Sequence, residues 1–380
     1  MKKRLLFITH HKLDENNGGC NAAKGFLHCF SQLFDDCSVI CHKIDHTSPY
    51  IPSGVEYYPM QDNRSKPRKL IDMYRGAISG HYYFVREHLR SHHYDIVVID
   101  HTFTGAGLSK YIKQTGARLI TIHHNVERDY LRDNGKEKPL PYRLPFLYYC
   151  RKSERDCLQY SDVNLTVTER DAETFRSWYP GIHVYKWGIF EYRDIPQKAF
   201  PQRTKEHTFV ITGSLYFEQS LRPILSFIIH YWPLVLKEIP KARLIIAGRN
   251  PSTQLQKACL SDDSITLIAN PDDMGAVVST ANYYICPISA GSGLKLRILD
   301  GLRQGLPVIC HEIAAAGYES LAAGGCLFSY SDEGSFIEAL HSMTASCSSP
   351  QQVYQLYNDS FSLESGVARL TNILQQENIL

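Results

Sequence analysis

The stretch "NYYICPISAGSGLKLRILDGLRQGLPVICHE" (residues 282–312) holds two short apolar runs, separated by a glycine-rich loop and an amphipathic segment. Leu294, Ile298 and Leu302 recur every four residues, which predicts a helix that begins near Gly293 and buries this stripe. A Gly-Leu-Pro sequence then ends the helical pattern before the second apolar run. A buried strand, a crossover helix and a second buried strand make a βαβ unit, so this stretch predicts a parallel sheet.

The same alternation of apolar runs and helix-length connections occurs on both sides of a polar, proline-containing segment in this chain of 380 residues. A chain of this length exceeds the size at which a single core stops growing. The sequence therefore predicts an α/β protein with two doubly wound, Rossmann-like domains facing a central cleft. We expect an N-terminal domain at 1–190, a linker at 191–207, a C-terminal domain at 208–358, and a helix at 359–380 that packs back on the first domain or closes the second.

The bulk composition argues against nucleic-acid-binding, membrane-spanning and disulfide-stapled proteins. The net charge of +2 gives no case for a nucleic-acid partner, which favours a strongly basic domain. No apolar stretch approaches the roughly 18 residues that a membrane helix needs. Eleven cysteines are an odd number, and they include no Cys-x-x-Cys pair. We expect a cytoplasmic protein.

The glycine-rich loop at 291–293 suits an anion, because positions without a Cβ let a ligand approach the backbone closely. Lys295 and Arg297 follow the loop and add positive charge beside it. Asp300 could accept hydrogen bonds from vicinal hydroxyls such as those of a ribose. The alternative interpretation is structural: Ser292 caps the helix, Lys295 is solvated, and Arg297 pairs with Asp300.

Four segments carry a resemblance to a known family. They are Gly18-Gly19 after the first apolar run, "TIHHNVERDY" (121–130), "ITGSLYFEQSLRPILSFIIHYWPLVLKEIPKARLIIAGRNP" (211–251) and "CPISAGSGLKLRILDGLRQGLPVI" (286–309). Together, and in this order, they resemble parts of the retaining GT-B glycosyltransferases of the family 4 group. The resemblance spans most of the chain and implies the GT-B architecture.

The resemblance implies a nucleotide-sugar donor and a transfer that needs neither a metal nor another cofactor. Asp300 would bind the nucleotide ribose, and the loop at 291–293 with Lys295 or Arg297 would hold the diphosphate. These cations would then stabilise the charge that grows on the leaving oxygens. The donor site implied in this way consists of Gly18, Gly19, Gly213, Ser214, Gly291, Ser292, Gly293, Leu294, Lys295, Arg297 and Asp300.

Two departures from the family pattern leave other functions open. Ser292 stands eight residues before Asp300, where the family usually has the first of two acidic residues. Ser214 and the segment 218–220 stand where the family usually has an Arg and a Lys. A noncatalytic GT-B partner subunit that binds or positions a transferase or its acceptor would tolerate both losses. A nucleotide-sugar epimerase on the same architecture is a third interpretation.

The first domain places polar side chains directly after two of its apolar runs. Ligands of doubly wound sheets bind beyond the carboxyl ends of strands, so His101 and His124 are candidates for contact with the donor sugar or the acceptor hydroxyl. Asp100 and Glu127 could orient a histidine or accept a proton. His101, His124 and Asp100 are therefore the candidate catalytic residues. The alternative is that these histidines are only hydrogen-bonded at a strand end.

Two further polar features receive structural interpretations. Glu154 is expected to be a charge on a helix surface, with a brace across the cleft as the alternative. The segment "HEIAA" (311–315) lacks the second histidine of the H-E-x-x-H zinc motif. The sequence therefore predicts no metal site.

Two segments, 65–90 and 140–155, combine cations with aromatic residues. Such surfaces could contact anionic lipid headgroups, which would place the protein at the inner face of the membrane. The alternative is a pair of solvated helix faces, with Tyr82, Tyr83 and Phe84 buried. The resemblance implies transfer of a sugar, with retention, to a hydroxyl of a glycan or lipid-linked acceptor in cell-surface polysaccharide or glycolipid synthesis.

Overall fold

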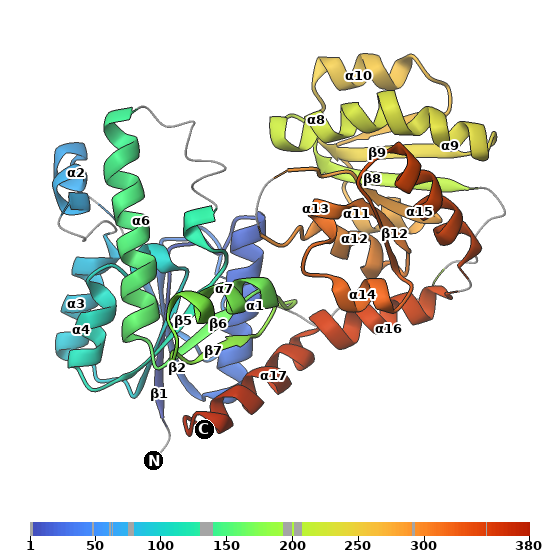
Figure 1. Ribbon diagram of the computed structural model, residues 1–380. Helices are drawn as coiled ribbons and strands as arrows, with labels where there is room; N and C mark the ends of the chain where they lie inside the picture. Colours follow the sequence, from blue (N-terminus) through green and yellow to red (C-terminus); the bar gives the residue numbers. More distant parts are fainter. Residues whose placement is uncertain are drawn as a thin grey trace. The chain divides into compact units, whose positions relative to one another are not determined.

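The computed structural model describes residues 3–47, 49–60, 62, 64–74, 80–129, 140–192, 200, 207–290, 293–346 and 348–380. The chain divides into two compact units (Figure 1). Unit 1 comprises Met1–Ile195 together with Ser360–Leu380, and unit 2 comprises Pro196–Asp359. Most of the linker expected at 191–207 lies outside the described residues.

Unit 1 contains a parallel seven-stranded sheet with the strand order β3-β2-β1-β4-β5-β6-β7. The chain runs outward in opposite directions from β1, so the order reverses between β1 and β4. In doubly wound sheets this switch point is where ligands bind. The strands are β1 Arg4–Thr9, β2 Asp36–His42, β3 Glu56–Met60, β4 Ile96–Asp100, β5 Arg118–His123, β6 Val163–Thr166 and β7 Val184–Lys186.

The helices of unit 1 cover the sheet, because β1 and β4 are buried runs of Leu, Ile, Val and Phe with no solvent-facing side. Helix α17, near the C-terminus, packs against α1. The helices are α1 Gly18–Leu33, α2 Lys66–Tyr74, α3 His81–Ser91, the 3-10 turn η1 Thr102–Thr104, α4 Leu108–Gln114, α6 Leu140–Tyr160, α7 Glu169–Trp178 and α17 Leu363–Gln376.

Unit 2 contains a second parallel sheet, with six strands in the order β10-β9-β8-β11-β12-β13. The order reverses between β8 and β11, so this sheet has its own switch point. The strands are β8 Thr208–Ser214, β9 Arg243–Arg249, β10 Ile265–Ala269, β11 Tyr283–Cys286, β12 Val308–His311 and β13 Leu327–Tyr330.

A core centred on Phe209, Trp232 and Phe336 fills unit 2. The helices are α8 Glu218–Ser226, the π-helical turn η3 Phe227–Tyr231, α9 Trp232–Glu238, α10 Thr253–Leu260, α11 Met274–Ser279, α12 Arg297–Arg303, α13 Glu312–Ala315, α14 Glu319–Ala323, α15 Glu333–Ala345 and α16 Pro350–Phe361. The prediction of two Rossmann-like domains with parallel sheets is confirmed.

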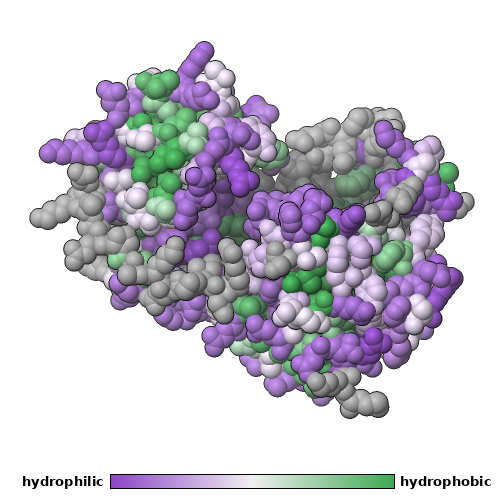
Figure 2. All heavy atoms as spheres, turned by 180° about the vertical axis from the view of Figure 1, so that it is seen from behind, coloured by the Kyte–Doolittle hydropathy of each residue, from purple (hydrophilic) through white to green (hydrophobic). Residues whose placement is uncertain are grey.

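The composition argues against a membrane-spanning protein and against a disulfide-stapled one, and the surface and the cysteines bear on these two expectations. Hydrophilic side chains cover most of the face seen in Figure 2, and hydrophobic ones gather in smaller areas. Among the residues that the structure describes, no helix is both long and apolar enough to span a membrane. The ten cysteines in the described ranges are all buried and form no disulfide with one another.

Candidate functional site

The first group of site residues lies at the carboxyl ends of three neighbouring strands of unit 1. Thr9 ends β1, and Asp100 ends β4 and stands beside Thr9 in the register. The N–H of His101 then donates to the carbonyl of Ile122 in β5 (3.0 Å). His124 follows β5 directly. Parallel strands bring these ends to one edge of the sheet, so side chains that are far apart in the sequence converge at the switch point.

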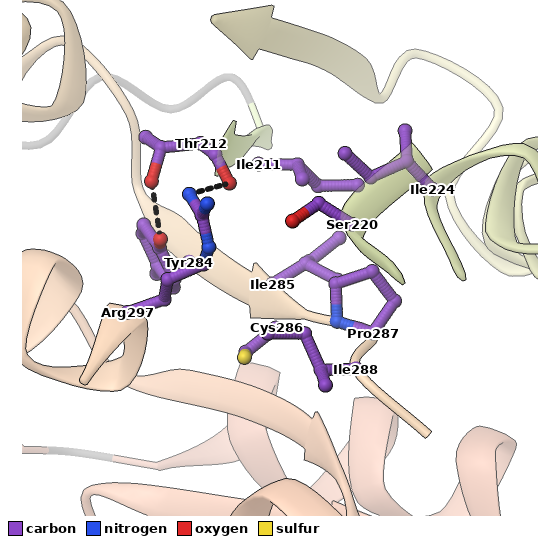
Figure 3. A pocket seen from close by; sticks show the side chains of 10 residues that line it. All are labelled: Ile211, Thr212, Ser220, Ile224, Tyr284, Ile285, Cys286, Pro287, Ile288 and Arg297. Carbon is purple, nitrogen blue, oxygen red and sulfur yellow. Dashed lines mark hydrogen bonds between the residues drawn. The ribbon is translucent and has the colours of Figure 1, made fainter. Parts of the chain in front are cut away.

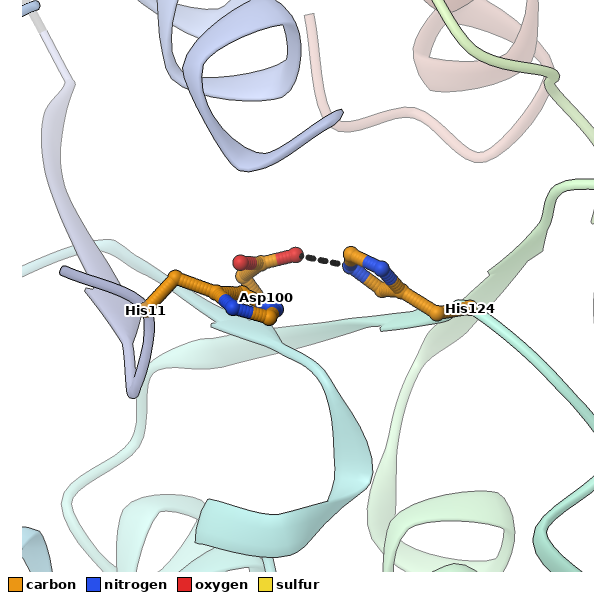
Figure 4. Close-up of side chains that lie close together, drawn as sticks. All are labelled: His11, Asp100 and His124. Carbon is orange, nitrogen blue, oxygen red and sulfur yellow. Dashed lines mark hydrogen bonds and ion pairs between the residues drawn. The ribbon is translucent and has the colours of Figure 1, made fainter. Parts of the chain in front are cut away.

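Asp100 is the centre of this group. Its carboxylate is fully buried and accepts a hydrogen bond from Thr9 Oγ1 to Oδ2 (2.7 Å). It accepts a second from His124 Nε2 to Oδ1 (2.6 Å), which Figure 4 shows. Burial by itself raises the pKa of Asp100, but the nearby His124, its hydrogen bond, His11 and Thr9 together lower it below the ordinary value. Asp100 is therefore an ionised acceptor that fixes the orientation of His124.

His101 adopts an unusual backbone conformation, with φ at 72°. Such a backbone is costly for a residue with a Cβ, and it is typical of functional sites. Its Nδ1 accepts the N–H of Phe103 (3.3 Å), so the proton of the neutral ring lies on Nε2, 3.4 Å from Glu127 Oε1. Burial, then His10 and His124, lowers the pKa of His101, which keeps the ring neutral.

A buried carboxyl pair supports this histidine. The backbone N–H of Glu127 donates to Glu154 Oε2 (2.6 Å), and Arg128 Nε lies 3.3 Å from Glu154 Oε1. Burial, followed by the charge of Glu154, raises the pKa of Glu127 to about 8. Burial also raises the pKa of Glu154, to about 7. The expectation that Glu154 is a helix-surface charge is wrong: its side chain is fully buried within unit 1, because α6 turns it toward the loop after β5.

The sequence reasoning missed His10 and His11, which follow β1. The ring of His10 lies 4.6 Å from that of His101, and the ring of His11 lies 5.3 Å from that of His124. The signal was present, since these histidines follow an apolar run just as His101 and His124 do. They complete a cluster of four histidines around Asp100.

Gly18 and Gly19 belong to this region of unit 1. Gly18 begins α1, and the preceding Asn17 caps the helix by accepting the N–H of Cys20 (3.0 Å). A Cβ on Gly19 would lie 2.5 Å from Cε1 of His11. A side chain at position 19 would therefore displace the His11 ring.

A hollow in unit 1 adjoins the histidine cluster. Its walls mix aromatic and polar side chains and include His10, His42, Asp62, His81, Phe103 and Tyr149. His81 is fully buried and its Nε2 contacts the carbonyl oxygen of Thr9 (2.9 Å). Aromatic rings beside hydrogen-bonding groups suit a sugar, which has apolar faces and polar edges.

The second group of site residues lies at the switch point of unit 2, near the carboxyl ends of β8 and β11. Arg297 donates from Nη1 to the carbonyl of Thr212 (3.1 Å), and a Cβ on Gly213 would lie 3.2 Å from the same nitrogen. Arg297 also lines a pocket with Ser220 and Pro287 (Figure 3). The guanidinium thus stands at the end of β8, next to Gly213 and close to the half-buried Ser214.

Asp300 is fixed at the same place. Its Oδ2 accepts from Thr212 Oγ1 (3.2 Å), and its Oδ1 lies 3.6 Å from Arg303 Nη1. Thr212 Oγ1 also contacts the hydroxyl of the buried Tyr284 (2.6 Å). The side chain of Asp300 is 35% exposed, so it can still accept a hydrogen bond from a ligand.

The helix after the glycine loop begins later than expected. The periodicity predicts a start near Gly293, but α12 begins at Arg297. Gly293 has a φ of 72°, which a helix cannot accommodate, and its carbonyl accepts from Lys295 Nζ (3.1 Å). The N–H of Ile298 is already used by the carbonyl of Lys295 (3.1 Å). The side chains of Lys295 and Arg297 supply positive charge at this place, and the N–H of Ile298 is not available to a ligand.

The remaining residues of the predicted donor site are placed in part. Gly291 and Ser292 lie outside the described residues. Leu294 is half-buried and precedes α12, whereas Ile298 and Leu302 are fully buried within it. Burial lowers the pKa of Lys295, with a smaller opposing effect from Cys286.

Within the described part of the segment 65–90, some cations and aromatics are engaged within unit 1. Arg68 pairs with the buried Asp72 (3.1 Å), which also pairs with Arg64, just before the segment (2.9 Å). Of the aromatic residues expected to be buried, Tyr83 is 42% exposed and donates its hydroxyl to Asp72 (3.1 Å).

Comparison with known proteins agrees with this architecture. Residues 206–346 match a family model described as glycosyl transferases group 1. A protein of Klebsiella pneumoniae, described as an uncharacterized 44.6 kDa protein in the cps region, is 24% identical over 242 residues. That alignment covers 59% of this chain and 59% of the relative, so the relative is matched over little more than half its length.

Solved structures match nearly the whole chain. The lipopolysaccharide outer core galactosyltransferase WaaB has a TM-score of 0.70 at 14% identity, covering 98% of this chain and 99% of that chain. Alr3699/HepE of Anabaena in complex with UDP has a TM-score of 0.65 at 9% identity, covering 98% and 100%. WaaG, a glycosyltransferase involved in lipopolysaccharide biosynthesis, has a TM-score of 0.64 at 14% identity, covering 98% and 99%. These likenesses show that the chain has the GT-B fold.

Proposed function

We propose that this protein is a glycosyltransferase that moves a sugar from a nucleotide-sugar donor to an acceptor hydroxyl with retention. The observation that carries the proposal is the polar group of Thr212, Arg297 and Asp300 at the switch point of unit 2. This group falls inside the segment that matches the glycosyl transferases group 1 model. The lipopolysaccharide enzymes among the structural neighbours support a role in cell-surface polysaccharide or glycolipid synthesis.

In the proposed donor site, Asp300 accepts hydrogen bonds from the ribose, while Arg297 and Lys295 face the diphosphate. The reaction releases a nucleoside diphosphate, and cations fixed in advance stabilise the charge that develops on it. No metal is assigned to this step. A neighbour that binds UDP makes a UDP-sugar the first donor to test.

In unit 1, we propose that the histidine cluster binds sugar hydroxyls and orients the acceptor. His101 and His124 are held in fixed orientations by Glu127 and Asp100. Each contact is made through Nε2 of the imidazole ring. Asp100 then serves as a positioning group, or as the acceptor of a proton relayed by His124.

The position of Arg297 favours an enzyme over a noncatalytic partner subunit. The family pattern places an Arg and a Lys after the first strand of the C-terminal domain, where this chain has Ser214 and the segment 218–220. The guanidinium of Arg297 reaches the end of that strand from α12, beside Gly213. A cation is therefore present at the strand end, although it comes from another element.

Thermal-shift titration with UDP-, GDP-, ADP- and TDP-sugars tests the donor site, using the full chain and its Arg297→Ala and Asp300→Ala variants. Each substitution removes hydrogen bonds to a charged group worth about 1.5–3 kcal/mol, so we expect roughly 10- to 100-fold weaker binding. Arg222→Ala is the control, since that arginine is 80% exposed and pairs with Glu218 on the surface of α8. Failure of every nucleotide-sugar to stabilise the wild type would remove the donor assignment and favour the partner-subunit interpretation.

A further inference from the structure

We propose that His11, Asp100 and His124 form a binding site for one divalent transition-metal ion, with Zn²⁺ as the best fit. Each residue offers one ligand atom, and these three atoms lie within 4.8 Å of one another (Figure 4). The inference goes beyond the proposed transferase function and does not depend on it. It also departs from the metal-free expectation that the family resemblance implies.

The site stands on a rigid base. Its ligands follow or end β1, β4 and β5, three neighbouring strands whose pairing fixes the backbone at their carboxyl ends. Thr9 Oγ1 donates to the second oxygen of Asp100 (2.7 Å), and such outer partners orient metal-binding carboxylates. The ring of His11 is placed by its close approach to Gly19. The protein thus positions the three ligand side chains in the absence of an ion.

The ligand set fits zinc. Two imidazoles and one carboxylate, with the fourth position left open, are a known arrangement for Zn²⁺, whereas Mg²⁺ strongly prefers oxygen ligands. Zinc ligands at about 2.0–2.2 Å from the ion lie roughly 3.3 Å apart in a tetrahedron. Asp100 Oδ1 and His124 Nε2 are 2.6 Å apart, so the ring must withdraw by less than about 1 Å. The wider spacings among the three atoms, at most 4.8 Å, must close by no more than about 1.5 Å.

The hydrogen bond between His124 and Asp100 is compatible with this assignment. Coordination through Nε2 of His124 requires the tautomer that carries its proton on Nδ1, so the ion would replace the hydrogen bond from Nε2 to Asp100 Oδ1.

Among the three proposed ligands, a purely structural hydrogen-bond network leaves one buried nitrogen without a partner, although Nδ1 of the neighbouring His10 is also unpaired. Nε2 of His11 is buried and has no hydrogen-bond partner among the described residues. Buried polar atoms are normally paired, since leaving one unpaired costs its hydration. A metal ion would use this nitrogen. His11 as a whole residue is only partly buried.

The test is calorimetric titration of the chelator-treated full chain with Zn²⁺, followed by visible absorption spectroscopy with Co²⁺. We expect about one ion per chain and the intense bands of four-coordinate cobalt. Loss of an outer hydrogen-bond partner of a metal ligand weakens metal binding by up to about 100-fold, and loss of the ligand itself should cost at least as much. His11→Gln and His124→Gln should therefore each weaken Zn²⁺ binding by at least about 100-fold. His230→Gln is the matched control, because His230 is exposed on unit 2. Mg²⁺ serves as the control ion.

Circular dichroism of each variant separates loss of a ligand from loss of the fold. The inference is overturned if the folded wild type binds no Zn²⁺, or if both cluster variants bind it as tightly as His230→Gln does. Weak cobalt bands in the wild type that are absent from the two variants would still support these ligands, with additional water molecules bound to the ion. The titration contains no nucleotide-sugar, so its outcome is independent of the donor-site test.

Discussion

Asp100 ends strand β4, and its buried carboxylate stabilises the side chains that surround it in unit 1. The carboxylate is fully buried, yet both of its oxygens accept hydrogen bonds, from Thr9 and from His124. The substitution Asp100→Asn keeps the size of the side chain and removes its charge. We expect a loss of about 1.5–3 kcal/mol in the free energy of unfolding at pH 7, since hydrogen bonds to a charged group are lost.

Urea denaturation at several pH values checks this prediction. A lowered pKa in the folded state means that the ionised carboxylate adds stability above the ordinary aspartate value of 3.8, and this is lost only as the pH falls through the folded-state value. The gap between wild type and Asp100→Asn should therefore persist from pH 7 down to about pH 4. The exposed Asp272→Asn is the control. Equal stability of Asp100→Asn and wild type at pH 7 would refute this stabilising role.

Glu127 titrates in the opposite sense. Its pKa is raised from an ordinary value of 4.5 to about 8, so the folded state holds a proton that the unfolded chain releases. This contribution to stability is complete below pH 4.5 and is lost as the pH rises through about 8. The substitution Glu127→Gln mimics the protonated form. We expect the variant to lose less stability than the wild type between pH 5 and pH 8.5 in thermal melts.

The control for Glu127→Gln is Glu338→Gln, on the exposed face of α15. That change should leave the pH dependence of the wild type intact. If Glu127→Gln also tracks the wild type over this range, Glu127 is ionised in the folded protein and the proposed proton on it is absent.

At the scale of an element, the position of α12 against β11 decides where Arg297 and Asp300 point. A Cβ on Gly301 would lie 2.5 Å from Cβ of the buried Tyr284, so glycine lets the helix approach the strand. Gly301→Ala should push α12 away at a cost of about 1–3 kcal/mol in stability. We also expect it to weaken nucleotide-sugar binding in the thermal-shift assay, although the residue contacts no ligand in our account.

A helical glycine with more room provides the comparison. Gly334, near the start of α15, would place a Cβ 3.4 Å from Asp332 Oδ1, an ordinary contact. Gly334→Ala should leave both stability and binding close to wild type. Full binding by a folded Gly301→Ala variant would show that the seating of α12 does not control the donor site.

At the scale of the whole molecule, the last helix is part of unit 1, which contains the first sheet. Helix α17 packs on α1, and Trp187 Nε1 donates to the carbonyl of Gly366 (2.9 Å). Buried apolar side chains of α17 each contribute about 1.5–3 kcal/mol. They are Leu363, Leu370, Ile373 and Leu374.

Removing residues 360–380 should therefore cost unit 1 an amount comparable to the whole stability of a typical domain, about 5–15 kcal/mol. We expect the truncated chain to lose the cooperative melting transition of unit 1. The full-length chain with the exposed Gln375 and Gln376 changed to Ala should melt like the wild type. A truncated chain that keeps every transition would show that α17 is dispensable.

Sequence periodicity was enough to predict the βαβ architecture, because the strands of both sheets are short apolar runs buried on two faces. It also predicted that Asp100, His101 and His124 lie at the same edge of the sheet, since strand ends of parallel sheets share one edge. It could not show which side chains meet there. The inclusion of His10 and His11 depends on the strand order β1-β4-β5, which no local pattern contains.

Two other features were beyond local patterns. The burial of Glu154 depends on how α6 turns relative to the loop after β5, and the late start of α12 depends on the positive φ of Gly293. Spacing gives the period of a helix, whereas its first residue depends on the backbone conformation of the loop that precedes it.

The most direct test of the central claim is a crystal structure of the full chain with the nucleotide-sugar that gives the largest thermal shift. We predict that the diphosphate lies within hydrogen-bonding distance of Arg297 or Lys295, and that the ribose hydroxyls contact the carboxylate of Asp300. A nucleotide bound away from the switch point of unit 2, with Asp300 still contacting only protein, would contradict it.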